Sequence, residues 1–489
     1  MKVLLLVPPS ENGVTTKYQL AFLDFTAPPL GLAYMAGVLE EHGYTGHTNV
    51  RILDSHALNY TPNDYRRYLK RFHPDILGIQ TLTPNFGAAM TGAQIAREEG
   101  VPHIILGGYH PSALPDECLK QSNGNITAVI RGEAEYTFLE FVQCVEEGME
   151  WRNIKGISYI GRNGEKPRKK EIIHNPPAPV IKDLDSLPLP SRHLLPMEKY
   201  KIFGSAFPAT SVITSRGCPY HCDFCSVSAF HEARYRARSP EKIADELRYL
   251  REVMDIKAAA FVDDLFFLSK KRVKNLTQEL SKVKDIYWGA TTRADSGKYE
   301  LLNLMRKAGC RLVFVGVESG SQTILDKIHK KTTINQIERY FDNTKKARMD
   351  SLASVSFGFP GETRSSIINT VEWIIQRLDP SLALFTLATP YPGTDFYQQM
   401  LKQGRIKEHD YSKYNLFHPI TEITGLDRQE LKALTKWAYK RFYLRPRKIL
   451  QNTKREFRYS LESYGLKQFL QNTQVFAKGI VNMKILTSM

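Results

Sequence analysis

Short apolar runs alternate with helical stretches along the first 145 residues of the chain. The helical stretches, residues 30–43 and 88–100, each end in glycine, which commonly follows the last turn of a helix. The apolar runs predict strands: KVLLLV (2–7), VRIL (50–53), DILGIQ (75–80), HIILGG (103–108) and AVIRG (128–132). This alternation predicts a doubly wound parallel α/β sheet over residues 1–145.

Ligands of such sheets bind beyond the carboxyl ends of the strands. The residues at these ends are small, polar or glycine. They are Pro8-Pro9-Ser10, Asp54-Ser55-His56, Thr81-Leu82-Thr83 and Gly107-Gly108-Tyr109-His110. The pattern therefore predicts a ligand site along this edge of the sheet.

The pattern changes after residue 145. Residues 146–205 contain a predicted hairpin and a proline-rich segment without periodicity, which indicates a linker. Residues 206–400 repeat a strand-and-helix unit roughly six times, which predicts a parallel barrel, full or partial, with its chemistry at the carboxyl rim. Its predicted strands are 210–217, 258–264, 287–295, 311–320, 353–362 and 382–393. For residues 401–489 we expect a helical, basic carboxyl-terminal region.

Composition is that of a globular protein, with 42% hydrophobic and 24% charged residues. There is no apolar run of about 18 residues, so we expect no membrane-spanning segment, and Met1–Val7 is too short for a signal peptide. Three of the six cysteines crowd into eight positions. That usage indicates a metal site in a reducing cytoplasm rather than a disulfide framework.

Positive charge is concentrated near the carboxyl terminus. The net charge is +16, and residues 431–459 contain ten Lys or Arg against one acid, Glu456. Leu431, Leu434, Ala438 and Phe442 recur there at helical spacing. One interpretation is a helix that lies peripherally on a membrane with its aromatic side down, and the other is a core-packing helix whose charges face water. Nucleic-acid binding is disfavoured because no groove-reading motif accompanies the charge.

The crowded cysteines, Cys218, Cys222 and Cys225, form a C-x3-C-x2-C motif after the first barrel strand. Thiolates bind iron–sulfur clusters or zinc. A structural zinc needs four ligands, and His221 alone is near enough to complete the set, at a spacing that zinc ribbons do not use. Three thiolates on a four-iron cluster instead leave one iron open for a substrate atom.

This motif resembles the signature of the radical S-adenosylmethionine (SAM) superfamily, with Phe224 as the aromatic residue before the last cysteine. The resemblance covers residues 206–400, where it implies a partial (β/α)6, TIM-like barrel. It implies a [4Fe–4S] cluster that accepts one electron from a flavodoxin or ferredoxin and cleaves SAM to a 5′-deoxyadenosyl radical. It also implies SAM contacts at the strand ends, from Asp263, Asp264, Arg293, Glu318, Gly358 and Glu362. The alternative for each charged residue is a cap or an inter-strand salt bridge.

A flavodoxin-like (Rossmann-like) sheet before such a barrel resembles the cobalamin-binding branch of the superfamily. The branch motif is D-x-H-x-x-G, then S-x-L, then G-G; here Asn59 replaces the first glycine, Thr81 replaces the serine, and Gly107 follows 26 residues after Thr81. His56 is either a cobalt ligand or a loop residue. Arg131 to Glu135 resembles the G-E-x-E turn of the branch, and is alternatively an acidic helix start. The implied cobalamin contacts are Pro9, Ser10, Asp54, Thr81, Leu82, Gly107, Gly108, Tyr109 and Glu133.

The resemblance implies a cobalamin-dependent methyltransferase that acts on an unactivated carbon. This branch also includes the anaerobic magnesium-protoporphyrin ester cyclase, so a ring closure or carbon–carbon coupling without methyl transfer is the alternative. A third hypothesis is a non-enzymatic cobalamin or redox sensor. A methylthiotransferase is disfavoured, because the amino-terminal domain offers Cys118 and Cys144 but lacks a third cluster cysteine. The sequence leaves the small-molecule substrate open, although a membrane-bound helix would favour a hydrophobic, lipid-like one.

Overall fold

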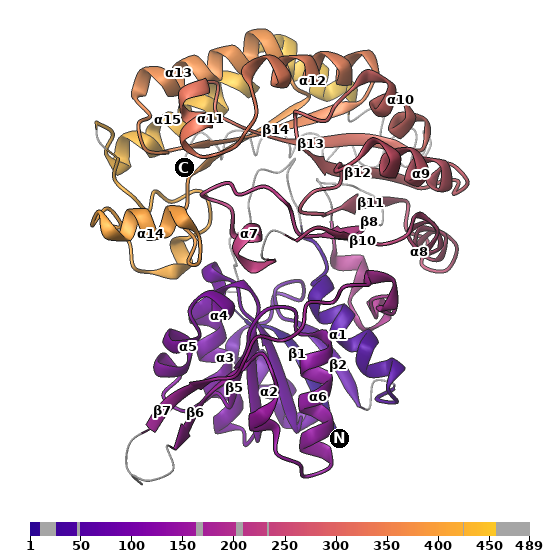
Figure 1. The fold of residues 1–489 in the computed structure, drawn as a ribbon, viewed down its shortest axis with the longest axis vertical. Coiled ribbons are helices and arrows are strands. Elements are labelled where there is room, and N and C mark those ends of the chain that lie inside the picture. Colours follow the sequence, from indigo (N-terminus) through magenta and orange to yellow (C-terminus); the bar gives the residue numbers. More distant parts are fainter. Residues whose placement is uncertain are drawn as a thin grey trace.

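The computed structural model describes residues 1–9, 26–45, 49–162, 170–201, 209–231, 234–423 and 425–455. Two α/β units follow each other along the long axis of the molecule (Figure 1). The amino-terminal unit, in indigo and purple, lies below the carboxyl-terminal unit, in magenta to yellow. The predicted α/β fold is confirmed.

The first unit is built on a seven-stranded sheet with the order β2-β1-β3-β4-β5-β6-β7. The strands are β1 (Val3–Val7), β2 (Val50–Asp54), β3 (Ile76–Gln80), β4 (His103–Gly107), β5 (Ala128–Ile130), β6 (Ile157–Arg162) and β7 (Lys170–His174). β1 to β5 run parallel, as predicted, whereas the β6–β7 hairpin of the predicted linker adds to the sheet in antiparallel pairing. The boundaries that we place at residues 145, 205 and 400 stay predictions.

Helices cover both faces of this sheet and enclose one apolar core on each side. α1 (Leu30–Glu41) and α6 (Glu135–Glu146) pack on one face. The other face carries α2 (Pro62–Phe72), α3 (Phe86–Glu98) and α5 (Pro115–Gln121), while the short α4 (Tyr109–Ala113) continues from β4. Strands covered on both faces need few polar residues, which is why their sequences are continuous apolar runs.

The second unit is an open barrel of six parallel strands, in the order β15-β14-β13-β12-β11-β8. They are β8 (Ala209–Val212), β11 (Ala258–Phe261), β12 (Tyr287–Thr292), β13 (Cys310–Glu318), β14 (Asp350–Phe357) and β15 (Leu382–Leu387). The outer helices are α8 (Pro240–Glu252), α9 (Lys270–Leu280), α10 (Tyr299–Lys307), α11 (Gln322–Lys327), α12 (Ile334–Lys346) and α13 (Arg364–Trp373), with α14 (Asp395–Lys402) beyond β15. The carboxyl ends of these strands gather at one rim.

Helix α15 (Arg428–Tyr443) covers the edge strand β15, and residues 446–455 form a further helical segment. The hydroxyl groups of Tyr439 and Tyr443 accept hydrogen bonds from the backbone N–H groups of Phe385 (3.1 Å) and Ala383 (3.0 Å). The apolar side of α15, with Leu431, Leu434, Ala438 and Phe442, is buried in the barrel core. The aromatic side that we considered for membrane contact is therefore used inside the protein, as the core-packing interpretation requires. Residues 456–459 of the basic segment lie outside the described residues.

Candidate functional site

The three-cysteine loop begins and ends in a short antiparallel ribbon formed by β9 (Ser215–Arg216) and β10 (Arg236–Ala237). Within the loop, α7 (Ser226–Phe230) starts directly after Cys225 and lies between the two units (Figure 1). Gly217 has φ of +81°, and a Cβ there would overlap the carbonyl oxygen of Arg234. The turn into the loop therefore requires glycine.

The three cysteines of the loop are the candidate cluster ligands. No three His, Cys, Asp or Glu side chains in the described ranges come close enough to hold one metal ion. In a four-iron cluster each thiolate binds a different iron, so the sulfurs need not converge on one point. Burial raises the pKa of all three thiols, that of Cys225 to about 11, and the Arg293 and Lys330 charges near Cys222 oppose this rise. These two cations favour the thiolates that a cluster requires.

Two adjacent carboxylates at the end of β11 hold the start of the loop. Asp263 accepts hydrogen bonds from the backbone N–H groups of Thr214 (2.6 Å) and Ser215 (3.1 Å) and from the Thr214 hydroxyl. Asp264 accepts from the N–H of Gly217 (2.8 Å), and burial raises its pKa to about 6. Asp263 thus shapes the strand end, and Asp264 is the carboxylate next to the cysteines.

Arg293, at the end of β12, joins this strand to the cysteine loop. Its guanidinium pairs with Asp295 (3.0 Å), donates to the carbonyl oxygen of Lys330 (2.7 Å) and lies 3.6 Å from the ring centroid of Tyr220. Tyr220 stands between Cys218 and Cys222 in the loop. The structure therefore brings Arg293 to the predicted site, where its guanidinium contacts the loop through the ring of Tyr220.

Glu318 ends β13 in a conformation that side chains rarely adopt, with φ of +62° at an irregularity of the sheet. Its carboxylate forms an ion pair of 2.7 Å with Lys330, and both side chains are 9% exposed. Burial opposes the positive charge of Lys330, but Glu318 and Cys222 outweigh it and raise the lysine pKa. Backbone strain of this kind is concentrated at functional sites, and here it aims a carboxylate at the rim beside the cysteines.

The turn after β14 has a buried carboxyl group. Glu362 is 1% exposed, and its Oε2 accepts from the N–H groups of Gly358 (2.6 Å) and Phe359 (3.1 Å), while its Oε1 is buried without a hydrogen-bond partner. Burial raises its pKa to about 7. Phe224 of the cysteine loop packs against Phe359, with ring centroids 5.3 Å apart. The predicted SAM residues are thus brought together around one loop.

The predicted cobalamin edge lies on the first unit, where β3 and β4 end. Gly108 has φ of +116°, and a Cβ on it would lie 2.6 Å from the carbonyl oxygen of Thr81, so this glycine is required by the fold itself. Gly107 is different, because the nearest atom to an added Cβ is the Ile130 carbonyl oxygen at 3.9 Å. Leu82 is 41% exposed beside it. An open backbone next to an exposed apolar side chain fits a large, flat ligand.

Asp54 and Pro9 are buried, and Ser10 lies outside the described residues. The Asp54 carboxylate accepts from the Tyr200 hydroxyl (2.9 Å) and from the N–H groups of His56 (3.1 Å) and Ala57 (3.0 Å). β2 is also the edge strand of the sheet, away from β3 and β4. Asp54 therefore ties the linker to its own loop, and Asp54 and His56 follow an edge strand that β1 and β3 separate from Gly107 on β4.

Tyr109 and Glu133 face the cysteine loop. Tyr109 stacks on Phe230 of α7, with centroids 4.2 Å apart. Glu133 forms ion pairs with Arg216 (3.0 Å) and Arg236 (2.7 Å) of the ribbon. Both residues were predicted as cobalamin contacts, and the structure places them where the two units meet.

The sequence analysis did not name Lys330, and it named His110 at a strand end without giving it a role of its own. Lys330 is buried, whereas its neighbour Lys331 is exposed, and nothing in the sequence separates them. His110 is 1% exposed, its Nδ1 lies 3.3 Å from the Thr83 hydroxyl, and its buried Nε2 has no hydrogen-bond partner within the described part of the chain. Burial lowers its pKa to about 4, so it is neutral at pH 7. In the sequence, His110 could have been recognised as a site residue because it directly follows Gly107-Gly108-Tyr109 at the end of a predicted strand.

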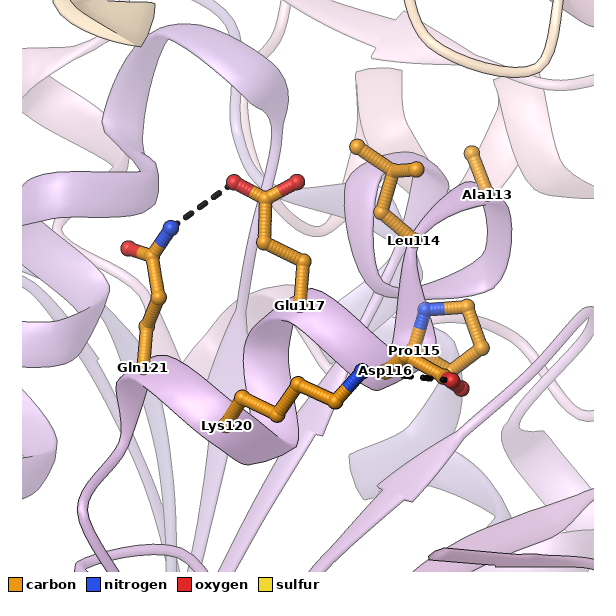
Figure 2. Close-up of a pocket in the computed structure, with 7 residues that line it drawn as sticks. All are labelled: Ala113, Leu114, Pro115, Asp116, Glu117, Lys120 and Gln121. Carbon is orange, nitrogen blue, oxygen red and sulfur yellow. Dashed lines mark hydrogen bonds and ion pairs between the residues drawn. The ribbon is translucent and has the colours of Figure 1, made fainter.

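A surface hollow lies apart from these residues, on α4 and α5 (Figure 2). It is lined by Ala113, Leu114, Pro115, Asp116, Glu117, Lys120 and Gln121. Glu117 bonds to Gln121 (2.8 Å) and to the Tyr411 hydroxyl (3.1 Å), and Lys120 faces Asp116 (3.9 Å). Each of its charged side chains thus has a partner, and none of the predicted site residues lines it.

Each of the two units matches a known protein family. Residues 212–374 match the Radical SAM superfamily, and residues 20–142 match the B12 binding domain. "Uncharacterized methyltransferase PH0819" of Pyrococcus horikoshii is 36% identical, over 92% of this chain and 94% of that protein. "Anaerobic magnesium-protoporphyrin IX monomethyl ester cyclase" of Rubrivivax gelatinosus is 31% identical, over 91% of this chain and 78% of that protein.

The fold is also that of a solved structure. The radical S-adenosylmethionine methyltransferase TsrM from Kitasatospora setae, with cobalamin and a [4Fe–4S] cluster bound, superposes with a TM-score of 0.66 at 20% identity. The superposition covers 82% of this chain and 75% of TsrM. A sheet unit followed by an open barrel is thus a known arrangement.

Proposed function

This chain belongs to the radical SAM superfamily, in the branch with an amino-terminal B12 binding domain, and we propose that it methylates an unactivated carbon of a small molecule. It is an enzyme whose cofactors are a [4Fe–4S] cluster, SAM and cobalamin. The observation that carries the proposal is the 36% identity to a methyltransferase over nearly the full length of both chains.

When bound, the three cofactors supply one-electron cleavage of SAM and a methyl donor, and the protein supplies binding and orientation. In the proposed site Cys218, Cys222 and Cys225 hold the cluster. Asp264 and Glu318 are the carboxylates that bind polar groups of SAM, and Arg293 keeps the loop ordered through Tyr220.

The aromatic residue and the turn after β14 complete the proposed SAM site. Phe224 and Phe359 close its apolar side, and Gly358 and Glu362 form the turn beside them. On the first unit, the open backbone at Gly107 and exposed Leu82 form the surface where we place cobalamin. The neutral His110, whose Nε2 has no hydrogen-bond partner among the described residues, is buried three positions after Gly107.

The enzyme acts on a small molecule and needs an electron donor, for which we propose a flavodoxin or ferredoxin. No helix of the described ranges combines the length and apolarity that crossing a bilayer demands. Because α15 buries its apolar side, the structure offers no support for a membrane-bound, lipid-like substrate.

The second candidate is a cyclisation without methyl transfer. It is favoured by the 31% identity to the cyclase of Rubrivivax gelatinosus over 91% of this chain. The two reactions differ in the fate of the SAM methyl group, which enters the product in one and stays out of it in the other.

The test uses reconstituted, reduced enzyme with cobalamin, SAM labelled in its methyl group, and a metabolite extract from a strain that lacks the gene. Methyl transfer predicts a labelled product together with 5′-deoxyadenosine. A new but unlabelled product would support cyclisation and contradict the proposal. The matched control is the variant with all three motif cysteines changed to Ala. It should form no new product, labelled or unlabelled, and no 5′-deoxyadenosine.

A further inference from the structure

We propose that Glu133 is a positioning residue: it docks the B12 domain onto the base of the cysteine loop by neutralising two arginines that face each other there. The inference deepens the proposed function, because it assumes that the loop holds the cluster. It also replaces the cobalamin contact that the resemblance implies for Glu133.

The ribbon at the base of the loop places like charges opposite one another. Arg216 on β9 and Arg236 on β10 are direct cross-strand partners. Like charges at opposite positions destabilise a strand pair. Arg216 also stands two residues before Cys218, so any opening of the ribbon moves the first cysteine.

Carboxylates of the other unit remove this repulsion. Oε1 of Glu133 pairs with Arg216 (3.0 Å) and its Oε2 pairs with Arg236 (2.7 Å), so one side chain bridges both strands. Glu135 adds a second contact to Arg216 (2.6 Å). With two arginines and two glutamates the network is balanced, and each of the four side chains is at most 10% exposed. We call these four residues the Glu133 network.

The network also contacts the linker. The backbone N–H of Ile181 donates to Glu133 (3.1 Å), and Arg236 donates to the carbonyl oxygen of Ile181 (2.6 Å). Nearby, Tyr109 stacks on Phe230, so the same interface meets the far side of the loop at α7. The loop is thus held at its base and at its helix by residues of the B12 domain.

Removing one partner of a buried ion pair leaves an uncompensated charge, which is strongly destabilising. Glu133→Gln should therefore loosen the ribbon and the cluster above it while leaving the cobalamin edge intact. The measurement is iron release from reconstituted full-length protein to excess bathophenanthroline disulfonate without oxygen, beside absorbance titration with hydroxocobalamin. We expect iron release to be faster by about tenfold or more, with cobalamin affinity unchanged.

Two further variants make the test specific to charge. Glu133→Gln combined with Arg236→Gln removes the repulsion and leaves Arg216 paired with Glu135, so iron release should return toward the wild-type rate. Glu40→Gln is the matched control, since Glu40 is a B12-domain carboxylate that meets linker residues Ser191 and His193 away from the ribbon. It should change neither measurement.

Unchanged iron release in Glu133→Gln would overturn the proposal, and loss of cobalamin binding alone would assign Glu133 to the cobalamin site. If the single variant does not fold, the double variant decides: release at the wild-type rate supports the proposal, and faster release overturns it. Wild-type protein that takes up no cobalamin would contradict the proposed function, but iron release would still test the network.

Discussion

Replacing Glu362 by Gln should make the protein more stable at neutral and alkaline pH than the wild type. The carboxyl group is 1% exposed, and burial raises its pKa from 4.5 to about 7. Because the folded state holds this proton more tightly than the unfolded state, the wild type loses stability as pH rises from about 4.5 to about 7. At about 1.4 kcal/mol for each pKa unit, the full loss above pH 7 is about 3 kcal/mol.

Glutamine has nearly the same shape and does not ionise, so it removes this pH-dependent loss. Its amide oxygen can still accept from Gly358 and Phe359. The strengthening of these two bonds when the wild-type carboxyl ionises is already contained in its pKa of about 7, so it adds no separate contribution. The informative measurement is therefore how the difference in unfolding free energy between the two proteins changes with pH.

The assay is urea unfolding of both proteins, followed by tryptophan fluorescence between about pH 5 and pH 8.5, the range that spans the raised pKa. The unfolding free energy of the variant, relative to that of the wild type, should increase up to about pH 7 and then stay constant at higher pH. Glu338→Gln is the control, because hydrogen bonds from Arg377 and Trp373 lower the Glu338 pKa below 4.5, so its difference from the wild type in unfolding free energy should stay constant across this range. Parallel curves for Glu362→Gln and the wild type across the range would refute the reasoning.

Four further outcomes are expected. Changing the three motif cysteines to Ala should abolish both iron binding and reductive SAM cleavage; cleavage by that variant would contradict the cluster assignment. Gly217→Ala should lower the iron content after reconstitution, because the new methyl group overlaps the Arg234 carbonyl oxygen, and a wild-type iron content would show that the turn can relax. Gly107→Val should weaken hydroxocobalamin binding by about tenfold or more, since its side chain enters the open space at the strand end; unchanged titration would place cobalamin elsewhere. His56→Ala should leave that titration intact, and lost binding would restore His56 as a ligand.

The sequence alone predicted the order of the elements and the centre of the chemistry. Continuous apolar runs such as residues 3–7 and 103–107 reveal buried parallel strands, because both faces of such a sheet are covered. The cysteine motif is visible because its ligands lie in one loop, within eight positions. Local spacing carries both signals, so both can be recognised without knowing what lies nearby in space.

The partners of charged and small residues were decided only by the tertiary structure. Glu133 and Arg216 are 83 residues apart, and Asp54 meets Tyr200 across 146 residues, so neither contact leaves a local pattern. Gly108 is glycine because the Thr81 carbonyl approaches it from another strand. The apolar stripe of α15 was equally compatible with a membrane and with the edge of a barrel. A sequence pattern shows that a face must be buried or a charge balanced, but which group does so depends on chain segments that only folding brings together.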